Sequence, residues 1–272
     1  MKAEIKSVFN SCGIEYFSPR DYSELRVINP HLEARLGFVP RSAFIFLVPY
    51  YTGDGENISS YAVSVDYHAA IKVMGEKLCQ GLSALFPEAH FSCSADHCPI
   101  DERHAALTSH LGILGKHGLL INEKYGTYVF VAEILTDLDP CRIYASCGGD
   151  IGHCCACGRC AEACPTGILR GESESCLSAI TQRKGELTES EIALMRKIGT
   201  AWGCDVCQRV CPHNAAPALT PIAMFYENRL TRVSVSDIEA MTDEEFSARA
   251  FAWRGRAVIL RNLRLLDGEE KI

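Results

Sequence analysis

The chain has no hydrophobic run long enough to cross a membrane. Its longest apolar stretch, residues 43–51, is far shorter than the roughly 20 residues that a membrane-spanning helix needs. The N-terminal segment lacks the unbroken apolar core of a signal peptide. The sequence also has no internal repeat, low-complexity tract or long linker. We therefore expect a soluble, cytoplasmic globular protein.

Positive charge is also scarce. The 272 residues include 27 Lys and Arg against 34 Asp and Glu, which gives a formal net charge of -7. This balance argues against a generally basic protein that coats nucleic acid, although a local basic face is compatible with it.

Cysteine, in contrast, is abundant, with 15 residues of this type. A reducing cytosol does not sustain a disulfide framework, so these thiols need another explanation. Most of them fall between Cys141 and Cys211. Such clustering points to metal binding rather than to packing.

The first cysteine run has the spacing C-x2-C-x2-C-x3-C-P. It consists of Cys154, Cys157, Cys160 and Cys164, followed by Pro165. In two-cluster ferredoxins, three thiolates at this spacing bind one iron–sulfur cube, and the fourth binds the other cube. The run therefore predicts a second set of cysteine ligands.

A second run supplies Cys204, Cys207 and Cys211, but Ala201 stands where a full copy would have its first cysteine. Cys176 is the only cysteine between the runs and would take that place. Two ligand sets then follow. One cluster would take Cys154, Cys157, Cys160 and Cys211, and the other would take Cys164, Cys176, Cys204 and Cys207.

Two structural zinc sites are the alternative, because zinc also binds four cysteines. Zinc sites usually show two separated C-x2-C pairs without the tight triple run or the proline, so the pattern favours iron–sulfur clusters. Free cysteine is often buried, and we expect most of the remaining seven to be core residues. These are Cys12, Cys79, Cys93, Cys98, Cys141, Cys147 and Cys155.

Hydrophobic periodicity predicts an α+β fold. We expect an N-terminal α/β domain over residues 1–145, a ferredoxin-like double-cluster domain over 146–216 and a helical tail over 217–272. Within the first domain, the pattern predicts strands over 43–51 and 90–96, helices over 64–86 and 101–115, and two strands within 118–135. Capping boxes predict helices after Thr188 and Thr242, and residues 255–266 read as a last helix.

Three further segments carry a resemblance to a known family. They are "YAVSVDYH" at 61–68, a D-x-x-P-x-x-E-R…G-x-x-G-K pattern from Asp96 to Lys116, and "GTYVFVAE" at 126–133. Together with the cysteine runs, they resemble epoxyqueuosine reductase over about residues 60–225. The resemblance implies a cobalamin-dependent oxidoreductase that completes queuosine synthesis in tRNA. It also implies that the clusters reduce cobalamin to the cob(I) state, which then reduces an epoxide.

The resemblance assigns protonation of the epoxide oxygen to Asp96. Removing that oxygen as water needs two electrons and protons, so a carboxylic acid is a suitable partner. We expect burial to raise its pKa. The alternative is that Asp96 caps the following helix. The resemblance further implies cobalamin contacts from Tyr61, Asp66, Tyr67, His68, Lys116, His117, Leu120 and Val131.

Several residues in the matching segments also have a purely structural interpretation. Tyr67 and His68 fit the core face of an amphipathic helix, and Lys116 and His117 fit a glycine turn. Asp101, Glu102 and Arg103 fit a solvent-exposed first helical turn, although Arg103 equally fits a partner for a buried carboxylate.

The resemblance implies tRNA and an external low-potential electron donor as partners. Members of the family usually continue into a helical repeat region that grips tRNA, whereas this chain ends soon after its last arginines. Phosphate contacts from Lys and Arg supply much of the energy of tRNA binding, so the acidic balance and short tail leave two alternatives open. These are a related reductase of a small molecule and a non-catalytic electron-transfer protein. The arginines are Arg254, Arg256, Arg261 and Arg264.

Overall fold

The computed structural model describes residues 3–143 and 153–268. The chain forms two compact units: one combines Met1–Tyr50 with His68–Cys154, and the other combines Tyr51–Tyr67 with Cys155–Ile272. We call them the sheet unit and the cysteine unit. The predicted three-domain division follows chain order and stays a prediction, whereas the cysteine unit joins an early segment to the cluster region and the tail.

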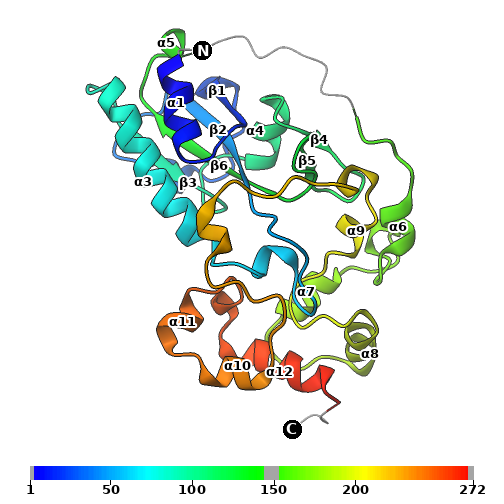
Figure 1. The fold of residues 1–272 in the computed structure, drawn as a ribbon. Helices are drawn as coiled ribbons and strands as arrows, with labels where there is room; N and C mark the ends of the chain where they lie inside the picture. Colours follow the sequence, from blue (N-terminus) through cyan, green and yellow to red (C-terminus); the bar gives the residue numbers. More distant parts are fainter. Residues whose placement is uncertain (1–2, 144–152, 269–272) are drawn as a thin grey trace. The chain divides into compact units, whose positions relative to one another are not determined.

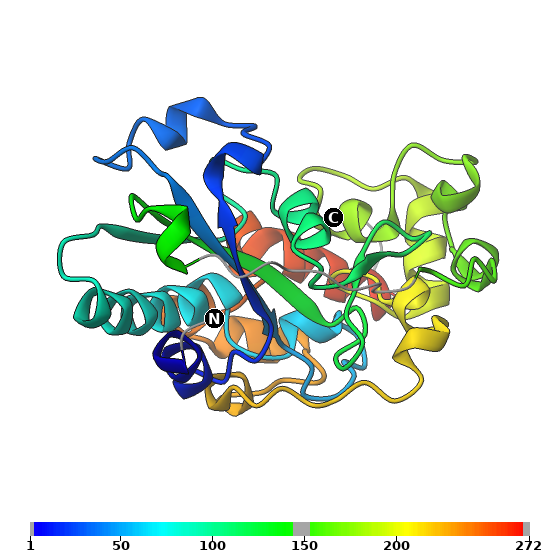
Figure 2. The same cartoon turned by 90° about the horizontal axis from the view of Figure 1, so that it is seen from above.

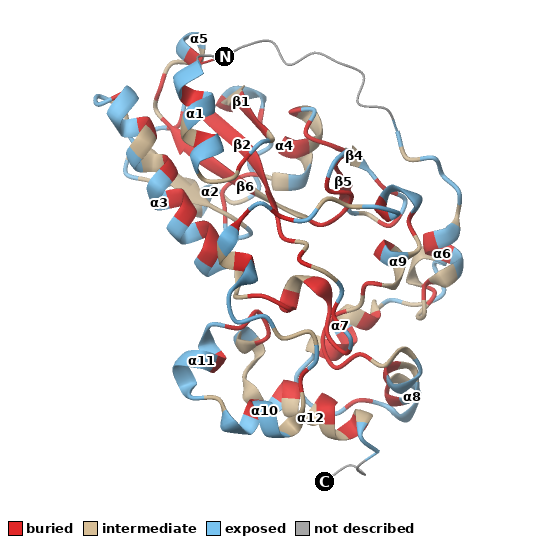
Figure 3. Ribbon diagram, viewed as in Figure 1, coloured by how far each residue is buried: buried red, intermediate tan, exposed pale blue. Residues whose placement is uncertain are grey.

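A four-stranded antiparallel sheet forms the centre of the sheet unit, with the order β1-β2-β6-β3. Every residue of β2 is buried, as Figure 3 shows. This explains why its sequence is a continuous apolar run rather than an alternating one. The strands are β1 Phe17–Asp21, β2 Ser42–Pro49, β3 Phe91–Ser94 and β6 Val129–Thr136.

Helices cover both faces of this sheet. α1 (Ala3–Ser11) and α3 (Tyr67–Leu85) lie on one face, and α4 (Glu102–Thr108) lies on the other (Figures 1 and 2). Because side chains alternate along β2, Phe44 and Phe46 face α1, where both rings contact Phe9. The intervening Ile45 belongs to the core beneath α4.

Short elements complete the sheet unit. A β4–β5 hairpin follows α4, and its two strands pair in antiparallel fashion. The remaining elements are η1 Tyr22–Glu24, α2 Pro30–Glu33, β4 Ile113–Leu114, β5 Leu120–Ile121 and α5 Pro140–Ile143.

The cysteine unit is built from short helices around the fully buried Trp202. The indole N–H of Trp202 donates to the Tyr61 hydroxyl at 2.7 Å, and Asn262 of the last helix donates to the Ala201 carbonyl at 2.7 Å. The elements are η2 Ser60–Ala62, α6 Arg159–Ala163, η3 Ile168–Arg170, α7 Leu177–Gln182, α8 Glu189–Ile198, α9 Val206–Arg209, η4 Pro212–Asn214, η5 Ala223–Tyr226, α10 Val235–Ala240, α11 Asp243–Ser247, η6 Ala252–Arg254 and α12 Arg256–Leu266.

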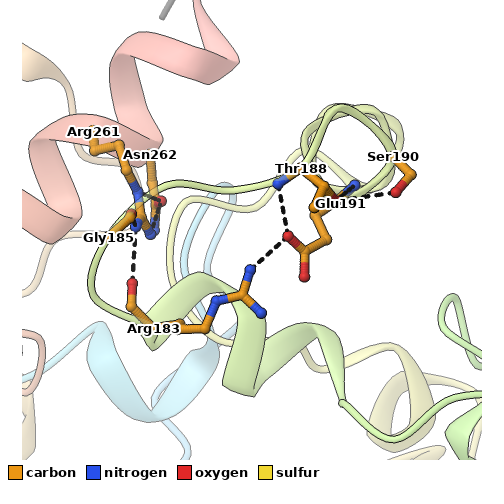
Figure 4. Close-up of polar contacts among 7 residues, drawn as sticks. All are labelled: Arg183, Gly185, Thr188, Ser190, Glu191, Arg261 and Asn262. Atoms are coloured by element: carbon orange, nitrogen blue, oxygen red, sulfur yellow. Dashed lines mark hydrogen bonds and ion pairs between the residues drawn. The ribbon is translucent and has the colours of Figure 1, made fainter.

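Figure 4 shows how polar contacts join α7, α8 and α12. Thr188 and Glu191 form the predicted capping box at the start of α8. Glu191 also accepts from Arg183 at 2.6 Å. Arg261 of α12 donates to the carbonyl oxygens of Arg183 and Gly185, which fixes α12 to the turn between α7 and α8.

The predicted α+β class is confirmed, and the predicted strands and both capping boxes are present. The helix predicted over 101–115 is shorter and ends at Thr108, because the chain then turns into the β4–β5 hairpin. In the part of the chain that the structure describes, no helix is both long and apolar enough to span a membrane.

Candidate functional site: the cysteine segment and the Asp96 loop

Short helices and tight turns carry the cysteines of the first run. Gly158 adopts a left-handed conformation with φ +82° and starts α6, which carries Cys160. Cys164 ends the same helix. Both side chains are buried. α6 packs against α9, so the segments of the two cysteine runs lie side by side.

The thiols of Cys204 and Cys207 in the second run are influenced by Cys164 of the first run and by Cys176 between the runs. Burial raises the pKa of Cys204 to about 11, and the neighbouring Cys176 and Cys164 add to this rise. Burial likewise raises the pKa of Cys207 to about 12, with further contributions from Cys204, Cys176 and Cys164. Like charges this close oppose ionisation unless a cation lies among them. The structure thus brings together the four members of one predicted ligand set.

Cys164 shows how a thiolate is accommodated here. Burial acts to raise its pKa, but hydrogen bonds from the Leu169 backbone N–H, from Thr166 and from the Gly167 N–H outweigh burial and lower it. Gly167 has φ +72°, and a Cβ at that position would collide with Glu172. Successive N–H donors at one sulfur suit an anionic ligand of a metal cluster.

The four cysteines of the other predicted ligand set have different surroundings. Cys211 is buried and directly precedes η4. Cys160 is buried on α6, Cys154 is half-buried and Cys157 is exposed. A hydrogen bond from the Arg159 backbone N–H lowers the pKa of Cys157.

The expectation that most remaining cysteines are core residues is only partly correct. Cys98 is buried, whereas Cys141 and Cys155 are exposed. Cys141 lies on the short surface helix α5, and Cys155 lies in a loop next to the first ligand. Cys147 is outside the described residues. Cys12, Cys79 and Cys93 are half-buried.

Asp96 lies in the loop between β3 and α4, and it does not cap the helix. The N-cap of α4 is Asp101, whose carboxylate accepts from the His104 N–H at 3.0 Å. Asp96 has φ +60°, a left-handed conformation that is uncommon for a residue other than glycine. Its carboxylate lies 3.4 Å from His68 Nε2 and its side chain is 54% exposed, so the expected burial of this acid is wrong.

The buried acid near this loop is Glu133 rather than Asp96, and Glu102 beside it is half-buried. Glu133 of β6 is fully buried, and Glu102 at the start of α4 accepts from the Asp96 backbone N–H at 2.6 Å. Burial raises the pKa of Glu102 to about 7, and burial also raises that of Glu133. The exposed first turn expected for Glu102 is therefore wrong. Glu133 is the one charged residue in the apolar strand "VFVAEIL", which was the available signal.

The predicted cobalamin contacts are divided between the two units. In the sheet unit, Lys116 is exposed, whereas His117 packs its ring on Gly115 and accepts from the Leu119 N–H at 3.2 Å. Leu120 belongs to the core, and Val131 is packed against it. The cysteine unit holds Tyr61, Asp66 and Tyr67.

Arg103 does not bind a buried carboxylate. Its guanidinium donates to the Gly118 carbonyl oxygen at 3.1 Å.

The arginines of the tail are engaged within the cysteine unit. Arg256 pairs with Asp243 at 3.0 Å and Arg264 pairs with Glu239 at 2.8 Å. Arg254 stacks on Trp253, with 3.7 Å between the guanidinium carbon and the ring centroid.

The fold and the paired cysteine runs define an iron–sulfur protein of the double-cluster type. Residues 153–214 match the family described as "4Fe-4S double cluster binding domain". This match supports iron–sulfur clusters rather than zinc.

The chain belongs to the epoxyqueuosine reductase family. It is 31% identical over 281 residues to the epoxyqueuosine reductase of Cellulophaga algicola, and the match covers 90% of this chain and 89% of the relative. The enzyme from Lactococcus garvieae is 30% identical over 213 residues, which cover 73% of this chain and 57% of the relative. The chain thus spans just over half the length of the first curated relatives that it matches.

Solved structures share the fold. The epoxyqueuosine reductase of Streptococcus thermophilus superposes with a TM-score of 0.80 at 23% identity, covering 98% of this chain and 80% of that one. An epoxyqueuosine reductase bound to an epoxyqueuosine-modified tRNA-Tyr stem loop gives a TM-score of 0.76 at 21% identity, with 97% of this chain and 80% of that one covered.

Proposed function

We propose that this chain is a cobalamin-dependent oxidoreductase that reduces epoxyqueuosine to queuosine in tRNA. The proposal rests on the membership of this chain in the epoxyqueuosine reductase family. The chain also combines a double-cluster segment with an acid, Asp96, in a strained backbone conformation. Because the substrate is tRNA, a cytoplasmic location belongs to the same proposal. An external low-potential donor would supply the electrons.

The ligand sets form part of the proposal. Cys164, Cys176, Cys204 and Cys207 would bind one 4Fe-4S cluster, and Cys154, Cys157, Cys160 and Cys211 would bind the other. The effect of Cys164 and Cys176 on the pKa values of Cys204 and Cys207 supports the first set. The side-by-side packing of α6 and α9 supports ligands shared between the two runs.

Cobalamin held by this chain would supply the two electrons of the reduction. Both C–O bonds of the epoxide would break, a double bond would form between the two carbons, and the oxygen would leave as water after taking up two protons. Asp96 would supply a proton to that oxygen from its exposed carboxyl group. His68, within 3.4 Å of that carboxylate, is placed to exchange protons with it.

The residues proposed to hold cobalamin differ in how well they fit this role. His68 and Lys116 have exposed polar groups that suit the polar side chains of a corrin. Leu120 contributes to the core, and the His117 ring is committed to its own turn. We therefore propose His68 and Lys116 as the first contacts to test, with Tyr61, Asp66, Tyr67 and Val131 as further members.

One observation favours a second candidate, a related reductase of a small molecule. The tail arginines make internal contacts, so they offer less charge to a tRNA backbone than the sequence suggests. The two candidates share cofactors and differ only in substrate.

The test is turnover by the anaerobically reconstituted protein with cobalamin and a low-potential reductant. Epoxyqueuosine-modified tRNA stem loop is the substrate, and nucleosides are quantified by mass spectrometry. Formation of queuosine in proportion to enzyme supports the proposal. A protein that carries both clusters and binds cobalamin but leaves the stem loop unchanged would favour the small-molecule reductase. A protein that ignores cobalamin would be an electron carrier.

A further inference from the structure

Two carboxyl groups hold the loop that carries Asp96: Glu133 is buried and Glu102 is half-buried. At its start, the Ser94 hydroxyl donates to Glu133 Oε1. In the middle, the Asp96 backbone N–H donates to Glu102 Oε1 at 2.6 Å. At its end, the Cys98 sulfur and carboxyl oxygens of Glu102 and Glu133 lie within 4.8 Å of one another, and the Cys98 thiol donates to the Ile100 carbonyl oxygen at 3.0 Å. The loop is therefore hydrogen-bonded to this pair of carboxyl groups at two points.

The two carboxyl groups are best described as sharing one proton. Glu133 is 0% exposed, and Oε2 of Glu133 has no hydrogen-bond partner among the described residues. A buried carboxylate oxygen without a donor is costly, and two adjacent carboxylates do not both ionise readily. The proton therefore belongs on Glu133, and Glu102 carries the negative charge.

The negative charge of Glu102 stabilises the backbone conformation of Asp96. A left-handed conformation costs a residue such as aspartate roughly 1 kcal/mol or more and persists only where its surroundings compensate. An N–H bond to an ionised carboxylate is among the stronger hydrogen bonds in proteins. The short Asp96–Glu102 contact supplies this compensation at the strained residue itself.

We propose that Glu102, with Glu133 protonated beneath it, is a positioning residue that holds Asp96 in its left-handed conformation for proton delivery. The catalytic part of this inference rests on the proposed function of Asp96. The positioning part concerns the loop alone and is measurable without turnover.

Several titratable groups surround the pair and contribute to its protonation. They come from η1, β3 and the Asp96 loop, and in the described structure they are Tyr22, Cys93, Asp96 and Cys98, while His68 of α3 contacts Asp96. The pKa values of the Tyr22 phenol and of the Cys93 and Cys98 thiols are raised, so these three groups are neutral near pH 7. The charge of the Asp96 carboxylate adds to the rise in the pKa of Glu102.

The test compares Glu102→Gln with Glu133→Gln, because only the first removes a negative charge in the proposed arrangement. Glu102→Gln removes the charge and should lower kcat about 10-fold or more, with KM and cofactor content unchanged. Glu133→Gln imitates a protonated carboxyl and should stay within about twofold of wild type. Glu189→Gln, which alters the corresponding first residue of α8, is the matched control.

The pH dependence of kcat adds a second measurement, which a purely structural role of Glu102 would leave unchanged. Wild-type kcat should fall as the pH drops through about 7, where Glu102 takes up its proton, and this fall should be absent from Glu102→Gln. Equal losses in both variants, or an unchanged profile in Glu102→Gln, would overturn the assignment.

Hydrogen exchange tests the loop without any substrate. In Glu102→Ala, the peptide spanning residues 94–98 should exchange faster than in wild type, while peptides of β2 and α3 keep their protection. Unchanged exchange at 94–98 would reject the positioning role even if the enzyme is active. Faster exchange in Glu102→Ala, together with a wild-type protein that does not reduce the stem loop, would reject the proposed function alone.

Discussion

The cysteine segment and the Asp96 loop present the same electrostatic problem in two chemical forms. In each, groups that carry like charge when ionised lie close together away from full solvent exposure: the thiols of Cys164, Cys176, Cys204 and Cys207, or the carboxyls of Glu102 and Glu133. In the proposed arrangement, cluster iron would neutralise the first group and a single proton would neutralise the second in part. The first arrangement therefore depends on metal, and the second depends on pH.

The largest effect is expected from removing a cluster ligand. Cys176→Ser should abolish turnover and lower the iron content by about half, because one of two four-iron clusters is lost. Iron analysis with an EPR spectrum checks this. Cys155→Ser, which changes an exposed neighbour of the first run, should keep full iron content. Full iron content in Cys176→Ser would show that the ligand set is wrong.

Removing the proposed acid, Asp96, should reduce turnover nearly as much, but it should leave the cofactor content unchanged. Asp96→Asn should keep both clusters and cobalamin and lower kcat by about 100-fold or more. Turnover of the modified stem loop and metal analysis measure the two properties separately. Wild-type turnover in this variant would remove Asp96 from the mechanism.

A smaller effect is expected on stability, and its sign follows from the raised pKa of Glu133. A carboxyl whose folded pKa lies above the unfolded value binds more protons in the folded state, so the wild type loses stability as the pH rises above the unfolded pKa. Glu133→Gln avoids this loss. Its free energy of unfolding should exceed that of wild type by about 1 kcal/mol or more at pH 8, and the difference should shrink toward pH 5.

Denaturant unfolding at the two pH values measures the difference, with Glu189→Gln as the control. A pH-independent difference would show that Glu133 does not titrate differently on folding.

The smallest effects are expected in the tail. Arg261→Ala should cost about 1–2 kcal/mol of stability, because two carbonyl oxygens lose their donor. Arg264→Ala breaks a partly exposed pair with Glu239 and should cost less than about 1 kcal/mol. Thermal unfolding compares the two. If Arg261→Ala instead keeps its stability and weakens stem-loop binding, Arg261 is a tRNA contact.

The comparison also explains what the sequence could predict. The proposed cluster ligands, such as Cys204 and Cys207, follow local spacing rules, so their pattern can be recognised in the sequence. The mixed fold and the capping boxes at Thr188 and Thr242 were predictable for the same reason. The role of Glu133 could not be predicted from local spacing. It depends on the fold, because β6 brings the Glu133 carboxyl group next to Glu102 and Ser94, which lie far away in the sequence.

Exposure was also difficult to predict. Asp96 was expected to be buried and is half exposed, while Glu102, expected in an exposed helical turn, is half-buried and accepts from the Asp96 backbone N–H. The internal use of Arg261 depends on where the turn between α7 and α8 lies, which spacing does not encode.

The most direct measurement is metal analysis of the anaerobically reconstituted wild-type chain. Two 4Fe-4S clusters require about eight iron atoms per chain, together with the EPR signals of reduced cubes. The account predicts this iron content and no bound zinc. A colourless protein that holds zinc and no iron would contradict it.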